Sequence, residues 1–305
     1  MNSCMLACTV ALMRLATFYA DGDVRFGGWT GTGYVALDAC GREVLESARN
    51  FLGSGREALD AAEEVLSRGG LPGFGEEEVT LLPPVPDPGK VICVGRNYSL
   101  HCEEQGKEVP TDPVIFTKFA ASLVGSGAEV VIPPESDAVD FEVELAAVIS
   151  APCWRVDPGK ALGHVGGYTV FNDISARDLQ ARDKQWTRAK SFETFGPMGP
   201  HLVTADEISD PGDLRISLDV NGVTMQDAST AQMVVSVGGL VSFVSRIVPL
   251  EPGDVIATGT PHGVGAFRDP PIFLGPGDVL SARIENVGTL VNRVVEFPGS
   301  ARQIR

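Results

Sequence analysis

The sequence predicts an α+β fold that is mostly β and is divided into two unequal units. The 305 residues contain 35 Gly and 21 Pro but only 7% aromatic residues, a balance typical of many short strands and turns. A hydrophobic content of 44% over this length is enough to bury one large core or two smaller ones. Apolar runs at residues 143–149 and 166–171 have the length of buried strands.

The first 75 residues predict a small N-terminal α/β domain. Apolar runs at residues 15–19 and 33–37 suggest strands, and residues 57–67 carry apolar side chains at helical spacing. A Gly- and acid-rich connector follows, so we place the domain boundary near residue 75, which divides the chain into residues 13–75 and 76–305. Residues 1–12 are apolar but lack the basic start and the length of a signal peptide, so we expect a disordered extension there.

Charge and cysteine content exclude several classes of partner. The net charge of -16 argues against binding a nucleic-acid backbone, and no segment approaches the roughly 20 apolar residues of a membrane span. The six cysteines include no Cys-x-x-Cys pair, which is typical of reduced thiols, so we expect a cytoplasmic protein. Cys102 lies beside His101 and could be read as a nucleophile, but a catalytic thiol needs a placed base and not merely a neighbour in sequence.

An acidic pair lies where a strand is expected to enter the core. Strand alternation puts Glu142 and Glu144 on one face. Two like charges there repel and lose solvation unless a cation lies between them. The next apolar run leads to Asp173, and three carboxylates without Cys or His form an oxygen set that suits Mg²⁺ or Mn²⁺. The alternative is a solvated strand face, on which paired acids are common.

A histidine and a glutamate follow the apolar strand predicted at residues 91–95. His101 and Glu104 are three residues apart on a short helix, so they can meet on one face as an imidazole oriented by a carboxylate. Such a pair is a general base for water, and the alternative is a chance pair on an exposed helix. The polar segment 105–112 suits a mobile lid over the histidine.

Three cationic side chains lie near the acidic runs in sequence. Lys118 has apolar neighbours on a predicted strand, which suggests a partly buried cation with an anionic ligand. Lys190 precedes a Gly- and Pro-rich stretch at residues 196–200 that we expect to be a loop. After Asp173, Ser175 fits the N-cap of a helix on which Arg177 and Gln180 share a face.

Five segments together resemble the fumarylacetoacetate hydrolase family. They occur in order within residues 80–297: residues 95–101 (GRNYSLH), 142–144 (EVE), 172–178 (NDISARD), 190–200 (KSFETFGPMGP) and 258–265 (TGTPHGVG). Each is weak alone, but the combination is highly specific. The N-terminal segment is similar to the small extra domain of bacterial two-domain members. The resemblance implies a mixed β-roll core, a homodimer and one Mg²⁺ or Mn²⁺ site per chain.

The resemblance also implies roles for individual residues. The implied metal ligands are Glu142, Glu144 and Asp173. The implied catalytic groups are His101 with Glu104, which activate a water, and Lys190, which stabilises developing negative charge. The implied substrate-binding residues are Arg96, Tyr98, Lys118, Arg177, Gln180 and Thr260. Long animal-type members have a further aspartate upstream of the histidine, where the nearest polar residue here is Asn97, so we expect waters to complete the metal shell.

These roles predict an enzyme that acts on a small anionic oxo acid. The first expectation is metal-dependent hydrolysis of a carbon-carbon bond in an acylpyruvate or fumarylpyruvate, as in catabolism of aromatic compounds or amino acids. The carbon-carbon bond breaks toward an enolate. Without an activated water, such an enolate results instead from loss of CO₂, which is decarboxylation, or is reprotonated elsewhere, which is tautomerisation or isomerisation of a 2-hydroxyhepta-2,4-diene-1,7-dioate type substrate. A protein that binds an oxo acid without turning it over is the remaining alternative.

Overall fold

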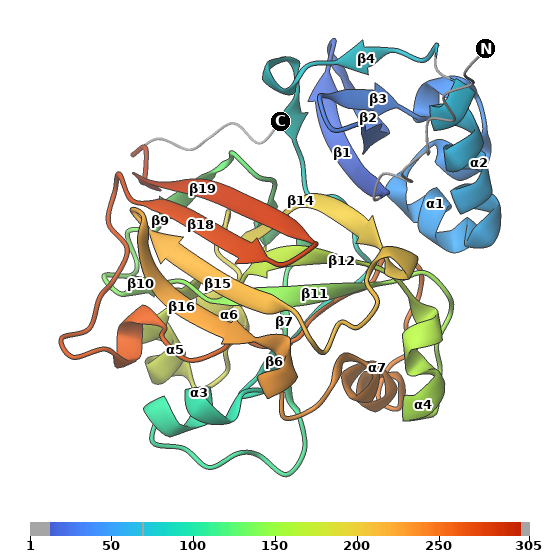
Figure 1. Ribbon diagram of the computed structural model, residues 1–305. Coiled ribbons are helices and arrows are strands. Elements are labelled where there is room, and N and C mark those ends of the chain that lie inside the picture. Colours follow the sequence, from blue (N-terminus) through green and yellow to red (C-terminus); the bar gives the residue numbers. More distant parts are fainter. Residues whose placement is uncertain (1–12, 69, 300–305) are drawn as a thin grey trace, which may run out of the picture.

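The computed structural model describes residues 13–68 and 70–299, and the extension expected at residues 1–12 lies outside them. A small unit that contains strands β1 to β4 and helices α1 and α2 lies beside a larger body made mostly of strands (Figure 1). The α+β, mostly β class is therefore confirmed. No helix within the described residues is both long and apolar enough to cross a membrane.

The main sheet runs through both units. Its strand order is β4-β3-β2-β1-β14-β12-β11-β17-β6-β7, with β5 paired to β1 and β8 paired to β14. The strands are β1 (Arg14–Ala20), β2 (Asp23–Trp29), β3 (Tyr34–Ala36), β4 (Gly73–Phe74), β5 (Thr80–Leu81), β6 (Val91–Gly95), β7 (Val114–Lys118), β8 (Leu123–Val124), β11 (Val143–Ile149), β12 (Val165–Asn172), β14 (Gly196–Thr204) and β17 (Val255–Ala257). Because Leu15 of β1 pairs with Leu202 of β14, the sheet is continuous between the units. The boundary near residue 75 stays a prediction.

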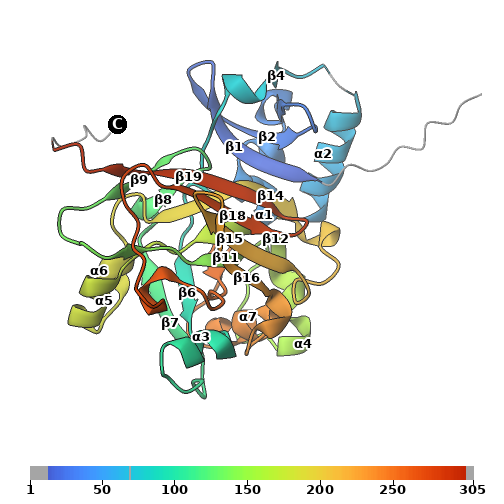
Figure 2. The same ribbon diagram turned by 60° about the vertical axis from the view of Figure 1, so that its left-hand side comes forward.

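A second sheet packs against the strands of the larger body (Figure 2). Its order is β16-β15-β18-β19-β9, and a short ribbon pairs β10 with β13. The strands are β9 (Glu129–Ile132), β10 (Val139–Asp140), β13 (Ser175–Ala176), β15 (Arg215–Val220), β16 (Val223–Ser229), β18 (Val279–Ile284) and β19 (Gly288–Glu296). Leu145 of β11, Leu218 of β15 and Leu280 of β18 are buried in one cluster. This shared core joins the two sheets.

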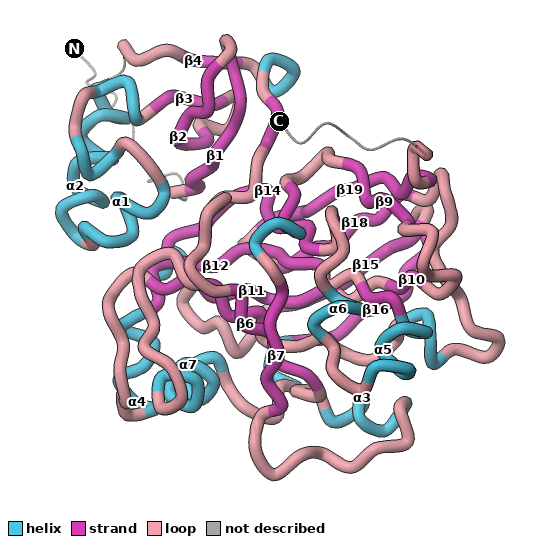
Figure 3. Tube along the Cα trace, turned by 180° about the vertical axis from the view of Figure 1, so that it is seen from behind, coloured by secondary structure: helices cyan, strands magenta, loops and turns pink. Residues whose placement is uncertain are grey.

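The helices lie outside the sheets in three groups (Figure 3). They are α1 (Ala48–Ser54), α2 (Arg56–Arg68), α3 (Ser99–Glu104), α4 (Pro158–Ala161), α5 (Arg177–Asp183), α6 (Thr187–Lys190) and α7 (Val237–Ser245). The side chains of Ala58, Ala62 and Val65 on helix α2 are buried, as the helical spacing predicts, in a core cluster that the N-terminal unit shares with strands of the larger body. Helices α4 and α7 lie side by side, and α3, α5 and α6 gather at one end of the larger body. That end carries the candidate site.

Two local predictions are wrong. Ser175 does not cap a helix: it lies in β13, its hydroxyl donates to the carbonyl of Asp173, and α5 begins after Ala176 without a side-chain cap. The Gly/Pro-rich stretch at residues 196–200 is not a loop but the start of strand β14. The pairing of β14 with β12 shifts register near Gly199, whose φ is +140°, and prolines are tolerated at such an irregularity.

Candidate active site

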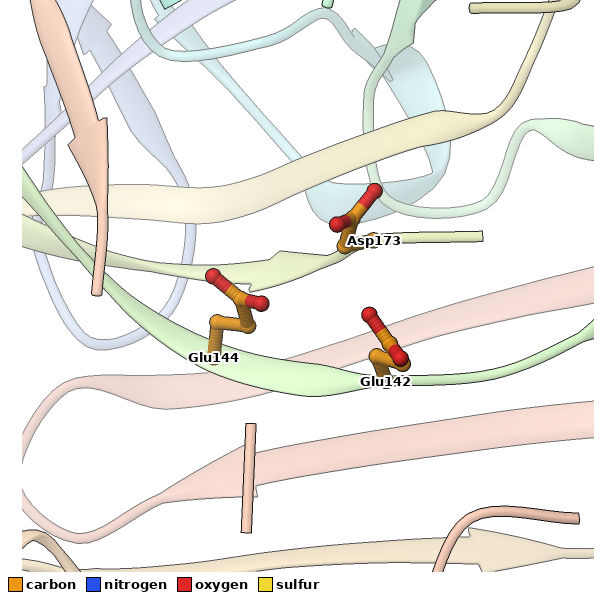
Figure 4. A group of neighbouring side chains, drawn as sticks. All are labelled: Glu142, Glu144 and Asp173. Atoms are coloured by element: carbon orange, nitrogen blue, oxygen red, sulfur yellow. The ribbon is translucent and has the colours of Figure 1, made fainter. Parts of the chain in front are cut away.

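Three carboxylates meet where strands β11 and β12 lie side by side. Val143 pairs with Asn172, and the N–H of Asp173 donates to the carbonyl of Glu142 at 2.8 Å, so these two acids lie opposite each other. Glu144 lies two residues further along on the same face. One oxygen from each carboxylate lies within 4.8 Å of the others, and the three side chains converge (Figure 4). All are at most 4% exposed, so the solvated strand face is excluded.

Two buried lysines and an arginine neutralise two of these acids. Lys190 Nζ donates to Glu142 Oε2 at 2.6 Å and to Asp173 Oδ2 at 2.7 Å. Lys118 Nζ donates to Asp173 Oδ1 at 2.6 Å, and Arg177 Nη2 donates to Glu142 Oε1 at 2.6 Å. Burial alone would raise the pKa of Glu142, but the charges of Arg177 and Lys190 outweigh burial and lower that pKa. The same pairing keeps the pKa of Lys190 above its usual value despite burial.

Glu144 has no cationic partner among the described residues. Its Oε2 accepts the N–H of Gly259 at 2.9 Å. Burial first, and then the charges of Asp173 and Glu142, raise the pKa of Glu144 well above its usual value. A divalent cation among the three carboxylates would remove this penalty, and an all-oxygen set suits Mg²⁺ or Mn²⁺. The residues therefore fit the metal that the family resemblance implies.

Helix α3 brings the predicted histidine and glutamate together. His101 Nδ1 donates to Glu104 Oε1 at 2.6 Å, and Glu104 Oε2 accepts the N–H of Gly263 at 2.8 Å. The second contact ties this pair to the segment that follows β17. Cys102, the alternative nucleophile, is buried, its thiol donates to the carbonyl of Arg96 at 3.6 Å, and burial raises the pKa of the thiol. A reactive thiolate is therefore disfavoured at Cys102.

Most of the predicted site residues line one pocket of about 250 Å³. Those that line it are Arg96, His101, Glu142, Glu144, Arg177, Gln180, Lys190 and Thr260. Glu104, Lys118 and Asp173 lie behind the wall, each bonded to a residue of the site. Tyr98 is different, because its buried hydroxyl has no partner among the described residues, and burial, then the charge of Glu144, raises its pKa. A substrate contact for Tyr98 stays a prediction.

Asp140 organises the site although it was not among the predicted site residues. Its Oδ2 accepts Arg177 Nε at 2.8 Å, and its two oxygens accept the N–H groups of Gly265 and Ala266 at 2.8 and 3.0 Å. The turn at Gly265–Phe267 is thereby fixed, with the Phe267 ring centroid 5.8 Å from the Arg177 guanidinium. The sequence signal that could have identified Asp140 is the one that identified Glu142, an acid within a buried strand segment.

Other side chains that contact the site were also not among the predicted site residues. Gln226 Nε2 donates to Thr260 Oγ1 at 2.8 Å. The Trp186 ring packs against Gly95, where a Cβ atom would lie 2.5 Å from the ring, so only glycine fits. Asn97 donates to the carbonyl of Thr258 at 2.8 Å, so its amide serves loop packing rather than the carboxylate group. Packing between distant segments brings these residues to the site.

Comparison with known proteins identifies the family. The family model described as fumarylacetoacetate (FAA) hydrolase C-terminal matches residues 90–295. "Oxaloacetate tautomerase FAHD2A, mitochondrial" of Homo sapiens is 47% identical over 267 residues, which is 87% of this chain and 85% of that protein. Among solved structures, fumarylacetoacetate hydrolase from Exiguobacterium antarcticum has 36% identity and a TM-score of 0.80, with 93% of this chain and 100% of that chain covered.

A further structure, 2-hydroxyhepta-2,4-diene-1,7-dioate isomerase from Mycobacterium marinum, has 35% identity and a TM-score of 0.72, with 94% of this chain and 100% of that chain covered. The relatives thus include a tautomerase, a hydrolase and an isomerase, each similar to this chain over most of both lengths. Together with the family model, they show that this chain belongs to the fumarylacetoacetate hydrolase family of enzymes.

Proposed function

We propose that the enzyme interconverts the keto and enol forms of a small 2-oxo diacid such as oxaloacetate, with a divalent metal. The observation that carries this proposal is the 47% identity, over 87% of the chain, with a human protein named oxaloacetate tautomerase. A pocket of about 250 Å³ supports a small substrate, because pockets for drug-sized ligands measure ~300–1,000 Å³.

Glu142, Glu144 and Asp173 are the residues that would hold one Mg²⁺ or Mn²⁺ ion. Each offers an oxygen within 4.8 Å of the others, and Glu144 is a buried carboxyl that makes no ion pair among the described residues. When bound, the ion supplies Lewis-acid polarisation of the keto oxygen. Lys118 donates to one oxygen of Asp173 and Lys190 to the other, so two lysines balance the charge of this carboxylate.

Cationic groups in the pocket wall bind the carboxylates of the substrate. Arg96 lies 5.9 Å from the Trp186 ring centroid, and its Nε is buried without a partner among the described residues. A planar guanidinium with unpaired N–H donors can bind a carboxylate through two parallel hydrogen bonds. Arg177 also lines the pocket, held in place by Asp140 and Gln180. These cations explain how a protein of net charge -16 binds a dianion.

His101 moves the proton. Glu104 accepts the hydrogen on Nδ1, so Nε2 carries the free electron pair and serves as the base. It takes a proton from the carbon next to the keto group, and the proton is then returned to the enolate oxygen. Lys190, which lines the pocket, stabilises the negative charge that develops between these steps.

Hydrolysis of a carbon-carbon bond in an acylpyruvate or fumarylpyruvate is the second candidate. It is favoured by the His101–Glu104 pair, which is arranged as a general base for water, and by the 36% identity with a solved fumarylacetoacetate hydrolase. Decarboxylation and dienoate isomerisation also pass through an enolate, formed by loss of CO₂ in the first case and by loss of a proton in the second. Binding without turnover is disfavoured, because a base, a lysine and an acid group that fits a metal all converge on one pocket.

A substrate panel tests the proposal. Oxaloacetate, acylpyruvates and fumarylpyruvate are assayed with Mg²⁺, Mn²⁺ or EDTA for the wild type, for His101→Ala and for His164→Ala, a control histidine that does not line the pocket. We expect enol-keto conversion of oxaloacetate that EDTA abolishes, that His101→Ala lowers by roughly 10²–10⁴-fold, and that His164→Ala preserves. Conversion that survives His101→Ala and EDTA refutes the assignment, and turnover of acylpyruvates alone favours the hydrolase.

We also propose a homodimer in a reducing compartment. The four described cysteines, Cys40, Cys93, Cys102 and Cys153, are free thiols, in keeping with a cytoplasmic location, although the human relative is named mitochondrial. Sedimentation analysis of the purified chain tests the dimer, and fractionation of the source cells tests the location.

A further inference from the structure

The base atom of His101 already has a partner inside the protein. Gln105 Nε2 lies 2.6 Å from His101 Nε2, on the opposite side of the ring from Glu104. A carboxylate at Glu104 can only accept, so Nδ1 carries the hydrogen, and the amide nitrogen of Gln105 can only donate, so Nε2 is the acceptor. Gln105 therefore donates a hydrogen bond to His101 Nε2, the atom that accepts the substrate proton in the proposed mechanism.

Gln105 belongs to a fixed part of the backbone. It directly follows helix α3 as its C-cap, and the turn there is held by bonds from Gly106 N to the carbonyl of Glu103 at 2.9 Å and from Lys107 N to that of Cys102 at 2.9 Å. The side chain lines the pocket together with His101. An amide displaced from Nε2 by a substrate therefore stays beside that atom, in the pocket wall.

Hydrolysis and tautomerisation make different demands on the space at Nε2. In hydrolysis, a water must lie ~2.6–3.2 Å from the base. Its O–H bond breaks with the proton going to Nε2, and its oxygen bonds to the distal carbonyl carbon. The carbon-carbon bond then breaks, its electron pair goes to the enolate of the released pyruvate, and that enolate takes the proton back from Nε2. In tautomerisation, the C3–H bond of the substrate breaks, the proton goes to Nε2, and it then passes to the enolate oxygen without a water.

We propose that Gln105 decides between these outcomes. Its amide holds the position at His101 Nε2 that a hydrolytic water would need, and so directs the enzyme to tautomerisation. Gln105 is thus a specificity-determining residue, and this inference rests on the proposed tautomerase function. An amide suits the task because rotation by half a turn presents its oxygen instead, which then accepts the N–H that His101 gains when it takes up the proton.

The test compares Gln105→Ala with Gln105→Met and with Glu103→Ala, an exposed control on the same helix. Alanine opens the position to water, whereas methionine fills a similar volume without a polar group. Each holoenzyme with Mg²⁺ receives an acylpyruvate. Hydrolysis is measured as released pyruvate, and tautomerisation as exchange of the C3 hydrogens with D₂O, both followed by NMR with kcat and KM determined separately.

We expect Gln105→Ala to raise the ratio of hydrolysis to exchange by roughly tenfold or more, which corresponds to about 1.4 kcal/mol in relative barrier height. The rise should occur in kcat for hydrolysis, and the ratio should stay near the wild-type value in Gln105→Met and Glu103→Ala. An unchanged ratio in a folded, active Gln105→Ala overturns the inference, as does an equal rise in Gln105→Met. A wild type that exchanges the C3 hydrogens of neither the acylpyruvate nor oxaloacetate refutes the proposed function itself, so the two failures are distinguishable.

Discussion

Replacing Glu144 by glutamine should remove a pH-dependent penalty from the metal-free protein. Glu144 is 1% exposed, lies close to Glu142 and Asp173, and accepts the N–H of Gly259. Burial and the two neighbouring charges raise its pKa above the usual 4.5. Between pH 4.5 and the raised pKa of the folded state, the folded protein holds a proton at Glu144 that the unfolded chain has released. This difference in bound protons makes the free energy of unfolding depend on pH.

The direction and size of the effect follow from proton linkage. Below pH 4.5 the carboxyl is protonated in both states and contributes nothing to the pH dependence. Above it, only the unfolded chain ionises, so the free energy of unfolding falls by up to about 1.4 kcal/mol per pH unit until the folded carboxyl also ionises. Glutamine cannot ionise, so the Glu144→Gln variant lacks this fall and should be the more stable protein at neutral pH without metal.

Urea unfolding in EDTA at about pH 5, 6 and 7 measures this difference, with exposed Glu103→Gln as the control. Addition of Mg²⁺ at about 100 times its dissociation constant should stabilise the wild type by ~2.7 kcal/mol and the variant far less. Parallel pH dependence in wild type and variant would refute the account of Glu144 as an unbalanced buried acid. Equal stabilisation of both by Mg²⁺ would refute its role as a ligand.

Three further substitutions test other contacts. Lys190→Met leaves two buried carboxylates without their shared cation, so urea unfolding in EDTA should show a loss of about 3–5 kcal/mol. Arg177→Lys breaks the fork that bonds Asp140 and Glu142, and steady-state kinetics should show KM for oxaloacetate rising about tenfold with a smaller change in kcat. Burial, then the charge of Arg14, lowers the pKa of His201 from 6.5 to about 4, so only the unfolded chain gains a proton in that window and stability falls by up to about 1.4 kcal/mol per unit as pH decreases. His201→Gln should flatten this slope in urea titrations between these two pH values, and an unchanged slope would contradict the buried, neutral histidine.

Part of the site could be predicted because its residues violate local rules. Glu142 and Glu144 interrupt a run that is otherwise apolar, and burial makes such charges expensive without a partner. His101 and Glu104 satisfy helical spacing, which alone brings two side chains onto one face. Each of these pairs lies within one element, where the periodicity of the backbone decides which side chains meet.

Other parts of the site are decided by contacts between distant segments. Lys118 bonds Asp173 across 55 positions and Lys190 bonds Glu142 across 48. No local period predicts such pairs, because they depend on which strands become neighbours in the sheets. The Gly/Pro stretch of β14 shows the same limit, since its turn-like composition is overridden by pairing with β12.

The sequence by itself determined the mostly β class, the acidic group, the His101–Glu104 pair and the family. All of these follow from the amino-acid composition, from the periodicity of strands and helices, and from the order of the motifs along the chain. Only the tertiary structure decided how the charges balance: two carboxylates are paired with lysines and an arginine, and Glu144 makes no ion pair among the described residues. It also placed Asp140 under the turn at Gly265–Phe267 and Gln105 against the base. The physical reason is that hydrogen bonds and charge pairs act over a few ångströms of space, whatever their separation along the chain.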